Sequence, residues 1–163
     1  MTDFESLYQS SAPQVRRFVL FLCGDSALAD DITSETFVRA WIGQGKIREA
    51  TVKAYLFTIA RNLYRDNLRR NRRNTELEES IPDDSPGLAN RTEHKAELAV
   101  VMKALQELPE IDRAVLLMRA QEEMPYEEIA QAMELPVTTV KVKVHRARLK
   151  LMQVRANFQE VSS

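Results

Sequence analysis

The sequence predicts an all-α fold, with two small helical domains joined by a flexible acidic linker. Apolar residues recur at helical spacings of three and four along most of the chain. Only four glycines and 7% aromatic residues favour helices over a turn-rich β architecture. Between residues 74 and 91 the chain becomes acidic, contains prolines and has few large apolar residues, which is typical of a solvated linker. We therefore expect domains at 1–73 and 92–163.

The composition narrows the class of protein. A net charge of −1 excludes a uniformly basic nucleic-acid-binding coat, so the distribution of charge along the chain matters more than its sum. Because Cys23 is the only cysteine, neither an internal disulfide nor a cysteine metal cluster can form, and we expect a small buried thiol. No segment approaches the roughly 20 apolar residues that span a membrane, so we expect a cytoplasmic protein without membrane insertion.

Two helices begin the N-terminal domain. The first covers about residues 3–22, with most of its large apolar residues on one face and an interruption near Pro13. Gly24 ends this helix, and Asp25 or Ser26 can cap the next one. The second helix, at about 27–41, carries acidic residues on the side opposite its apolar face: Asp30, Asp31 and Glu35.

A long third helix completes this domain. Two glycines within residues 42–50 break the second helix, and a regular apolar stripe then runs from about 52 to 70. A second stripe on this helix is basic, with the spacing i, i+4, i+8 and i+11, so that four guanidinium groups share a face. These residues are Arg61, Arg65, Arg69 and Arg72.

The C-terminal domain starts with a helix at about 92–107, and Pro109 suits the first turn of the next helix. Ile111, Val115 and Leu116 supply the apolar face of that second helix. Two domains of about 70 residues each bury little surface and are marginal alone. We therefore expect each domain to be completed by a partner surface.

Residues 140–151, "VKVKVHRARLKL", combine two periods. The first five alternate apolar and basic residues, as a half-buried strand does. A longer stripe has steps of three, four, three and four, and it outlasts the alternation. The segment is therefore predicted to be a helix that buries this stripe and exposes Val142 beside basic residues. The stripe consists of Val137, Val140, Val144, Ala147 and Leu151.

The helix before this stretch gives it a context. "YEEIAQAMEL" predicts a short helix, "ELPV" a tight turn, and the basic helix follows, which together make a helix-turn-helix. Ala130 is small enough to let the two helices approach, and no acidic residue lies between Leu135 and Phe158. Such a helix can read base edges in the major groove with its first turns. An ordinary basic helix that packs on an acidic protein remains the alternative.

Three motifs together resemble the extracytoplasmic-function (ECF) class of bacterial sigma factors, the initiation subunits of RNA polymerase. They are "DDITSETFVRAW", "AYLFTIARNLYRDNLRR" and "LPEIDRAVLLM" followed by "YEEIAQAMELPVTTVKVKVHRAR", and the resemblance covers nearly the whole chain in order. It implies a factor without catalytic chemistry that binds core RNA polymerase and directs promoter-specific transcription initiation. It also implies control by an anti-sigma factor.

The resemblance assigns roles by position. The clamp coiled coil of the largest polymerase subunit would be bound by Asp30, Asp31, Glu35 and Arg39. The minus-10 element would be recognised and melted by Arg61, Asn62, Tyr64, Arg65 and Arg69, with help from the "GQGKIREA" loop. The minus-35 element would be read by Thr138, Thr139, Lys141, Val142, Lys143 and Arg146. Trp41 is expected in the core.

Some residues depart from the family pattern. Ser34 stands where glutamine is usual, so one polymerase contact is expected to differ. Val142 replaces a small polar residue and Thr138 stands where glycine is common, which puts the promoter preference in doubt. Glu134 occupies a turn position usually held by glycine. If that position needs a left-handed backbone, the strain is on the order of 1 kcal/mol.

Two other classes of function fit the sequence less well. A stand-alone helix-turn-helix regulator would bind duplex DNA without polymerase, but it has no use for the arginine stripe at 61–72. An enzyme is disfavoured because no catalytic pairing, glycine-rich phosphate loop or metal-ligand spacing is present, and we expect no cofactor and no metal.

Overall fold

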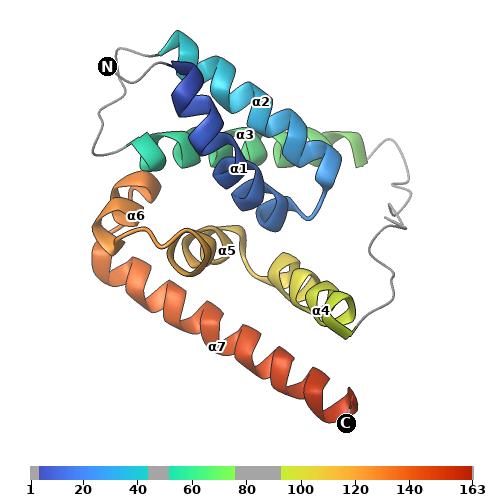
Figure 1. Cartoon of the computed structure of the whole chain (residues 1–163). Helices are drawn as coiled ribbons and strands as arrows, with labels where there is room; N and C mark the ends of the chain where they lie inside the picture. Colours follow the sequence, from blue (N-terminus) through green and yellow to red (C-terminus); the bar gives the residue numbers. More distant parts are fainter. Residues whose placement is uncertain (1–3, 44–51, 76–92, 163) are drawn as a thin grey trace.

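The computed structural model describes residues 4–43, 52–75 and 93–162, and every regular element there is helical (Figure 1). The all-α prediction is therefore confirmed. The predicted linker, apart from its first two residues, and most of the glycine-containing loop lie outside the described residues. The elements are α1 (Phe4–Cys23), α2 (Ser26–Ile42), α3 (Val52–Thr75), α4 (Glu93–Glu107), α5 (Glu110–Leu116), the π-helical turn η3 (Leu117–Gln121), α6 (Tyr126–Met133) and α7 (Val137–Ser162).

Helices α1 to α3 form one layer of the molecule (Figure 1). The rings of Phe18 in α1 and Phe57 in α3 stack with their centroids 4.6 Å apart. Asp25 caps α2 as expected, since its carboxylate accepts a hydrogen bond from the backbone N–H of Leu28 at 3.1 Å. Pro13 lies within α1 and does not interrupt it, contrary to the sequence expectation.

Helices α4 to α7 form the second layer, with the long α7 along its outer side (Figure 1). The predicted stripe of α7 is confirmed, because Val140, Val144 and Ala147 are almost completely buried. Val142 is 47% exposed, as the helical interpretation requires. The strand alternative for residues 140–144 is therefore excluded.

The two layers pack directly on each other. Helix α1 contacts α4, α5 and η3, and α3 contacts α6. One hydrophobic cluster runs through both layers, from Val15 in α1 to Ala147 in α7. Each small helical half is thus completed by the other half of the same chain, whereas the sequence suggested only that some partner was needed.

Within the part of the chain that is described, no helix combines the length and the apolar character that crossing a bilayer requires.

Candidate functional site

Helix α2 presents a charged face on the outside of the first layer. Asp30, Asp31, Glu35 and Arg39 are all exposed. Arg16 of α1 forms an ion pair with Asp30 at 2.6 Å, and Glu35 pairs with Arg39 at 3.3 Å. Exposed pairs of this kind contribute little to stability, so they can be exchanged for pairs with another protein.

An apolar patch continues this charged face toward the end of α2. Val38, Trp41 and Ile42 are 52%, 56% and 79% exposed. The expectation that Trp41 lies in the core is therefore wrong. Its ring and that of Phe4 in α1 pack edge to face with the centroids 4.7 Å apart, and more than half of the Trp41 side chain stays exposed. Charged surface borders apolar surface here, as in protein interfaces, where a polar rim surrounds an apolar centre.

The residues predicted for the minus-10 element separate into two groups on α3. Asn62, Arg65 and Arg69 are exposed. Arg61 and Tyr64, by contrast, are only 7% and 5% exposed and face the second layer.

Helix α5 provides the partners of the buried group. The Arg61 guanidinium donates two hydrogen bonds to the Glu110 carboxylate, at 2.7 and 2.9 Å. The hydroxyl of Tyr64 accepts a hydrogen bond from Arg113 at 3.0 Å. The expectation that four arginines share one exposed face of α3 is thus wrong for Arg61, because a carboxylate from the other half of the chain binds it.

A polar cleft separates α2 from α3. One section of it has a volume of about 360 Å³ and is lined by Arg39 of α2 together with Asn67 and Arg70 of α3. Arg70 lies off the basic stripe, so the sequence pattern alone does not indicate it. Asp31 and Glu35 of α2 line the same section, so the cleft carries charges of both signs.

The helix-turn-helix is formed by α6, the turn at 134–136 and α7. Glu134 has φ 56° and ψ 45°, so the left-handed conformation considered from the sequence is confirmed. The turn is closed by the N–H of Leu135, which donates to the carbonyl of Ala130 at 3.0 Å. Ala130 is 7% exposed at the crossing of the two helices, as predicted.

The first turns of α7 expose most of the residues predicted to read the minus-35 element. Thr138, Lys141, Val142 and Arg146 are exposed, and Thr139 is half-buried. Lys143 is also half-buried, since its amino group forms an ion pair with Asp112 of α5 at 3.2 Å.

One aromatic ring gathers cations beside the start of α7. The Lys141 amino group lies 5.6 Å from the centroid of the Tyr126 ring, and the Arg119 guanidinium lies 4.5 Å from the same centroid. Arg119 also donates to the carbonyl of Met124 at 3.1 Å, which fixes its position. No sequence pattern indicates Arg119, because it precedes the helix-turn-helix and belongs to no basic stripe.

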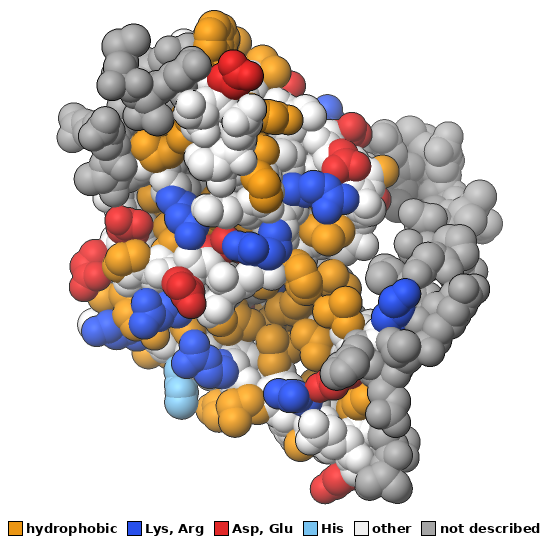
Figure 2. All heavy atoms as spheres, in the orientation of Figure 1, with side chains coloured by type: hydrophobic (Ala, Val, Ile, Leu, Met, Phe, Trp, Pro, Cys, Tyr) orange, Lys and Arg blue, Asp and Glu red, His pale blue; other side chains and the backbone are white. Residues whose placement is uncertain are grey.

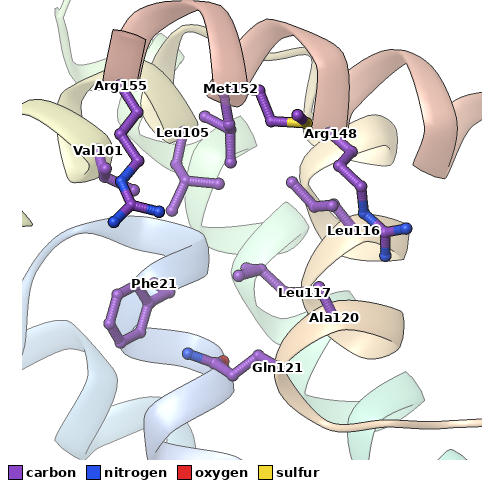
Figure 3. Close-up of a pocket in the computed structure, with 11 residues that line it drawn as sticks. Phe21, Val101, Leu105, Leu116, Leu117, Ala120, Gln121, Arg148, Met152 and Arg155 are labelled. Carbon is purple, nitrogen blue, oxygen red and sulfur yellow. The ribbon is translucent and has the colours of Figure 1, made fainter. Parts of the chain in front are cut away.

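An apolar groove of about 340 Å³ lies among α4, α5, η3 and α7 of the second layer, with Phe21 of α1 on one side (Figures 2 and 3). Phe21 of α1 points into it from one side, and Met152 of α7 closes it from the other. Arg148 and Arg155 stand at its edge. The rest of its lining comes from Val101, Leu105, Leu116, Leu117, Ala120, Gln121 and Leu151.

Comparisons with known proteins agree with this arrangement. The family described as Sigma-70 region 2 matches residues 7–74, and Sigma-70, region 4 matches residues 98–151. The ECF RNA polymerase sigma factor EcfG of Rhodopseudomonas palustris is 33% identical over 144 residues, which cover 87% of this chain and 79% of EcfG. The ECF RNA polymerase sigma factor SigM of Bacillus subtilis is 31% identical over 153 residues, covering 90% of this chain and 91% of SigM.

Solved structures share the fold. The sigma factor RpoE of Bartonella quintana, in complex with the anti-sigma factor NepR, superposes with a TM-score of 0.78 at 24% identity and covers 94% of this chain. That match covers 97% of the RpoE chain. The PhyRSL–NepR complex of Sphingomonas sp. Fr1 gives a TM-score of 0.69 at 20% identity, with 95% of this chain and 91% of that chain covered. From its relatives and from the order of its two matched regions, this chain belongs to the ECF RNA polymerase sigma factors.

Proposed function

We propose that this sigma factor divides promoter-specific initiation among three of its helices. In this proposal α2 docks on the clamp coiled coil of core RNA polymerase, α3 recognises and opens the minus-10 element, and α7 reads the minus-35 element as duplex. The observation that carries the proposal is that each helix exposes a different chemistry suited to its target: acidic and apolar on α2, amide and guanidinium on α3, and basic on α7. The stand-alone regulator is not favoured, because the family match includes both halves of the chain.

The role of α2 rests on fixed charges next to apolar surface. Charges on an exposed helix speed association and set its orientation, while apolar side chains contribute affinity when they are buried in the complex. Replacing Asp31 with arginine should therefore weaken binding to purified core polymerase. The separate variant Trp41→Ala should weaken this binding by a larger factor. The matched control is Glu107→Arg, which reverses an exposed charge on α4.

Binding to core polymerase is the measurement for this surface. Equal affinities for Asp31→Arg, Trp41→Ala and Glu107→Arg would show that α2 does not provide the docking face.

The role of α3 rests on its exposed amide and guanidinium groups. An amide can read the edge of an unstacked base, and guanidinium groups can bind the phosphates of a single strand. Asn62→Ala should therefore reduce promoter opening more than it reduces the first binding of the holoenzyme to duplex DNA. Permanganate reactivity of thymines reports opening, and a gel shift of the closed complex reports binding. Equal losses in both assays would contradict the role of Asn62.

We also infer that an anti-sigma factor restrains this chain. The supporting observation is the apolar groove, whose lining comes from the C-terminal half and from Phe21 of α1, and whose edge carries Arg148 and Arg155. An amphipathic helix with acidic flanks would bury this surface and match its charged edge. Such a helix would hold the two halves in one arrangement.

The groove can be tested with the chain expressed in its own cells. Met152→Glu places a charge in the groove and should abolish co-purification of a protein that inhibits transcription by the reconstituted holoenzyme. Binding of the variant to core polymerase should be unchanged, because α7, which carries Met152, and α2 lie on opposite sides of the molecule (Figure 1). Retention of the inhibitor by Met152→Glu would contradict the groove as its site.

A further inference from the structure

Helix α7 has a continuous exposed face opposite the residues that fix it in the core. Val140, Val144 and Ala147 are almost completely buried, so they set the rotation of the helix about its axis. On the other side, exposed side chains recur with the spacing i, i+3, i+4, i+7, i+8 and i+11 over about three turns. They are Thr138, Lys141, Val142, His145, Arg146 and Leu149, and we call this set the reading face. His145 and Leu149 have no role in the function proposed above.

His145 lies near the middle of this reading face. It follows Val142 by three residues and precedes Leu149 by four, so it lies on the helix surface between two exposed apolar side chains. Within the described part of the chain no other side chain binds its imidazole, whereas Lys143 is held by Asp112 at 3.2 Å. The imidazole is therefore available to a ligand outside the protein.

An imidazole can recognise the edge of a base by hydrogen bonding. In its neutral form one ring nitrogen donates a hydrogen bond and the other accepts one. In the major groove both purines present N7 as an acceptor, and neither pyrimidine has a ring nitrogen there. A donor nitrogen on His145 therefore suits a purine on the strand that it faces.

Val142 adds apolar chemistry to the same face. Its side chain is 47% exposed among basic residues, and thymine is the base that presents a methyl group in the major groove. Residues three apart in a helix are separated by about 4.5 Å along its axis, close to the ~3.4 Å spacing of stacked base pairs. Val142 and His145 are therefore placed to contact neighbouring base pairs.

We propose that His145 is a specificity-determining residue of α7. It donates a hydrogen bond to N7 of a purine in the minus-35 element, beside a thymine whose methyl group contacts Val142. This inference rests on the proposed role of α7 as the reader of the minus-35 element, and it names two neighbouring base types that the element contains. A cation farther along the helix, such as Lys150, is suited to phosphates, which position the protein without selecting a sequence.

Base analogues test the two contacts separately. The holoenzyme, made of core polymerase and this full-length chain, first selects promoters from a library that is randomised in the minus-35 region. In the selected duplex, deoxyuridine then replaces each thymine in turn and removes only its methyl group. A 7-deazapurine replaces each purine in turn and exchanges only N7 for carbon. Binding of each duplex is measured for the unaltered chain, Val142→Ser and His145→Ala, with Lys150→Ala as the control on the same helix.

We expect one sensitive thymine with a sensitive purine next to it. Loss of the methyl group should weaken binding of the unaltered chain roughly fourfold, and loss of N7 should weaken it roughly fivefold. Val142→Ser should bind the thymine and deoxyuridine duplexes equally, and His145→Ala should bind the purine and 7-deazapurine duplexes equally. Lys150→Ala should weaken binding to every duplex by the same factor and keep both differences. His145→Gln should retain a contact and shift the selected purine toward adenine, which an amide recognises through N6 and N7.

Two kinds of result would overturn the assignment of His145. One is a selected element in which no purine lies next to a thymine. The other is a His145→Ala variant that stays as sensitive to every 7-deazapurine as the unaltered chain. The role of α7 itself is judged by Arg146→Ala: if this variant loses affinity for the minus-35 duplex while no analogue affects the unaltered chain, α7 remains the reader and only the assignment of His145 fails. If Arg146→Ala and Lys150→Ala bind as the unaltered chain does, the proposed role of α7 fails as well.

Discussion

Two glutamates hold a backbone conformation that glycine adopts more readily. Glu123 and Glu134 both have φ of 56°, one before α6 and one after it. The side chain of a non-glycine residue crowds its own carbonyl in this region, which destabilises the fold by about 1–2 kcal/mol per residue. The two turns that frame α6 therefore contain strain.

Replacing either glutamate with glycine should stabilise the fold. Relief of the crowding exceeds the added freedom of the unfolded chain, so Glu123→Gly and Glu134→Gly should each raise the free energy of unfolding by about 0.5–1 kcal/mol. Gly24 offers the reverse change: its φ is +72° and an added Cβ would lie 3.2 Å from the Gln106 side chain, so Gly24→Ala should be destabilising. Urea denaturation measures all three, and a loss of stability in both glutamate variants would show that these carboxylates make contacts worth more than the strain.

Cys23 is a protected thiol. Burial raises the pKa of Cys23, and backbone hydrogen bonding at Asp25 opposes this only in part. The protonated thiol donates to the carbonyl of Asp25 at 3.4 Å. The thiol therefore stays protonated at neutral pH and reacts slowly, because the thiolate is the nucleophile.

The raised pKa of Cys23 makes the stability of the fold depend on pH in the alkaline range. With its pKa raised in the folded state, the thiol contributes stability that is complete below the unfolded value of about 8.5 and is lost as pH rises through the folded value. The free energy of unfolding should therefore fall above that pH relative to Cys23→Ala, and alkylation by iodoacetamide should be much slower than for a cysteine peptide. Alkylation at the peptide rate at pH 7 would contradict this account.

The conformation and burial of single residues could be predicted from the sequence in some cases and not in others. The family pattern with glycine at position 134 indicates a left-handed backbone there, whereas no sequence pattern marks Glu123. The sequence favours Trp41 in the core over a role as a platform for a base. Its exposure follows from the position of α1, which covers only one part of the indole, and such a position depends on tertiary packing rather than on local pattern.

At the level of elements, the basic residues of α7 fall into two groups, those that are exposed and those that are paired with another helix. Arg146 is exposed and free to approach DNA, whereas Lys143 is held against Asp112 of α5. The first turns of such a helix contact base edges, and the cations farther along lie near phosphates. Alanine replacement of Arg146 and of Lys143 is therefore expected to reduce the affinity for promoter DNA by different amounts.

Arg146→Ala should weaken binding of the holoenzyme to duplex promoter DNA by about 1–3 kcal/mol if a base contact is lost. Lys143→Ala should reduce the binding free energy by less, because the lysine must leave Asp112 before it binds DNA. Promoter affinity measured over a range of salt concentrations separates the two. If removal of Arg146 leaves the affinity unchanged at every salt concentration, its assignment is wrong.

The π-helical turn η3 could not be read from the sequence. The N–H of Glu122 donates to the carbonyl of Leu117 at 3.1 Å, five residues back, and this wider turn places the Glu122 carboxylate at the junction of the layers. Residues 114–118 are buried on every side of the chain, so their apolar pattern has no period that would distinguish a π turn from an α turn. Helices with one apolar face and one exposed face, such as α7, do show a clear period in the sequence, and they were therefore predicted well.

On the scale of the whole molecule, the sequence predicted two helical halves but not the surface between them. The linker-like composition suggested independent domains, yet the charges that join the halves lie far apart in the chain, as Arg17 and Glu122 do. Pairing of distant charges leaves no local pattern, because any carboxylate can serve any guanidinium. The same limit explains why Arg61 was expected on an exposed face: its spacing matched the other arginines, and its partner Glu110 is recognisable only in three dimensions.

The central claim is that this chain directs core polymerase to promoters. The most direct test is transcription by purified core RNA polymerase, with and without this protein, on sheared genomic DNA from its own organism. We predict transcripts with defined starts, each preceded by two short shared sequence blocks, one for α3 and one for α7. The absence of any stimulated transcript, together with no binding to the core enzyme, would contradict the account.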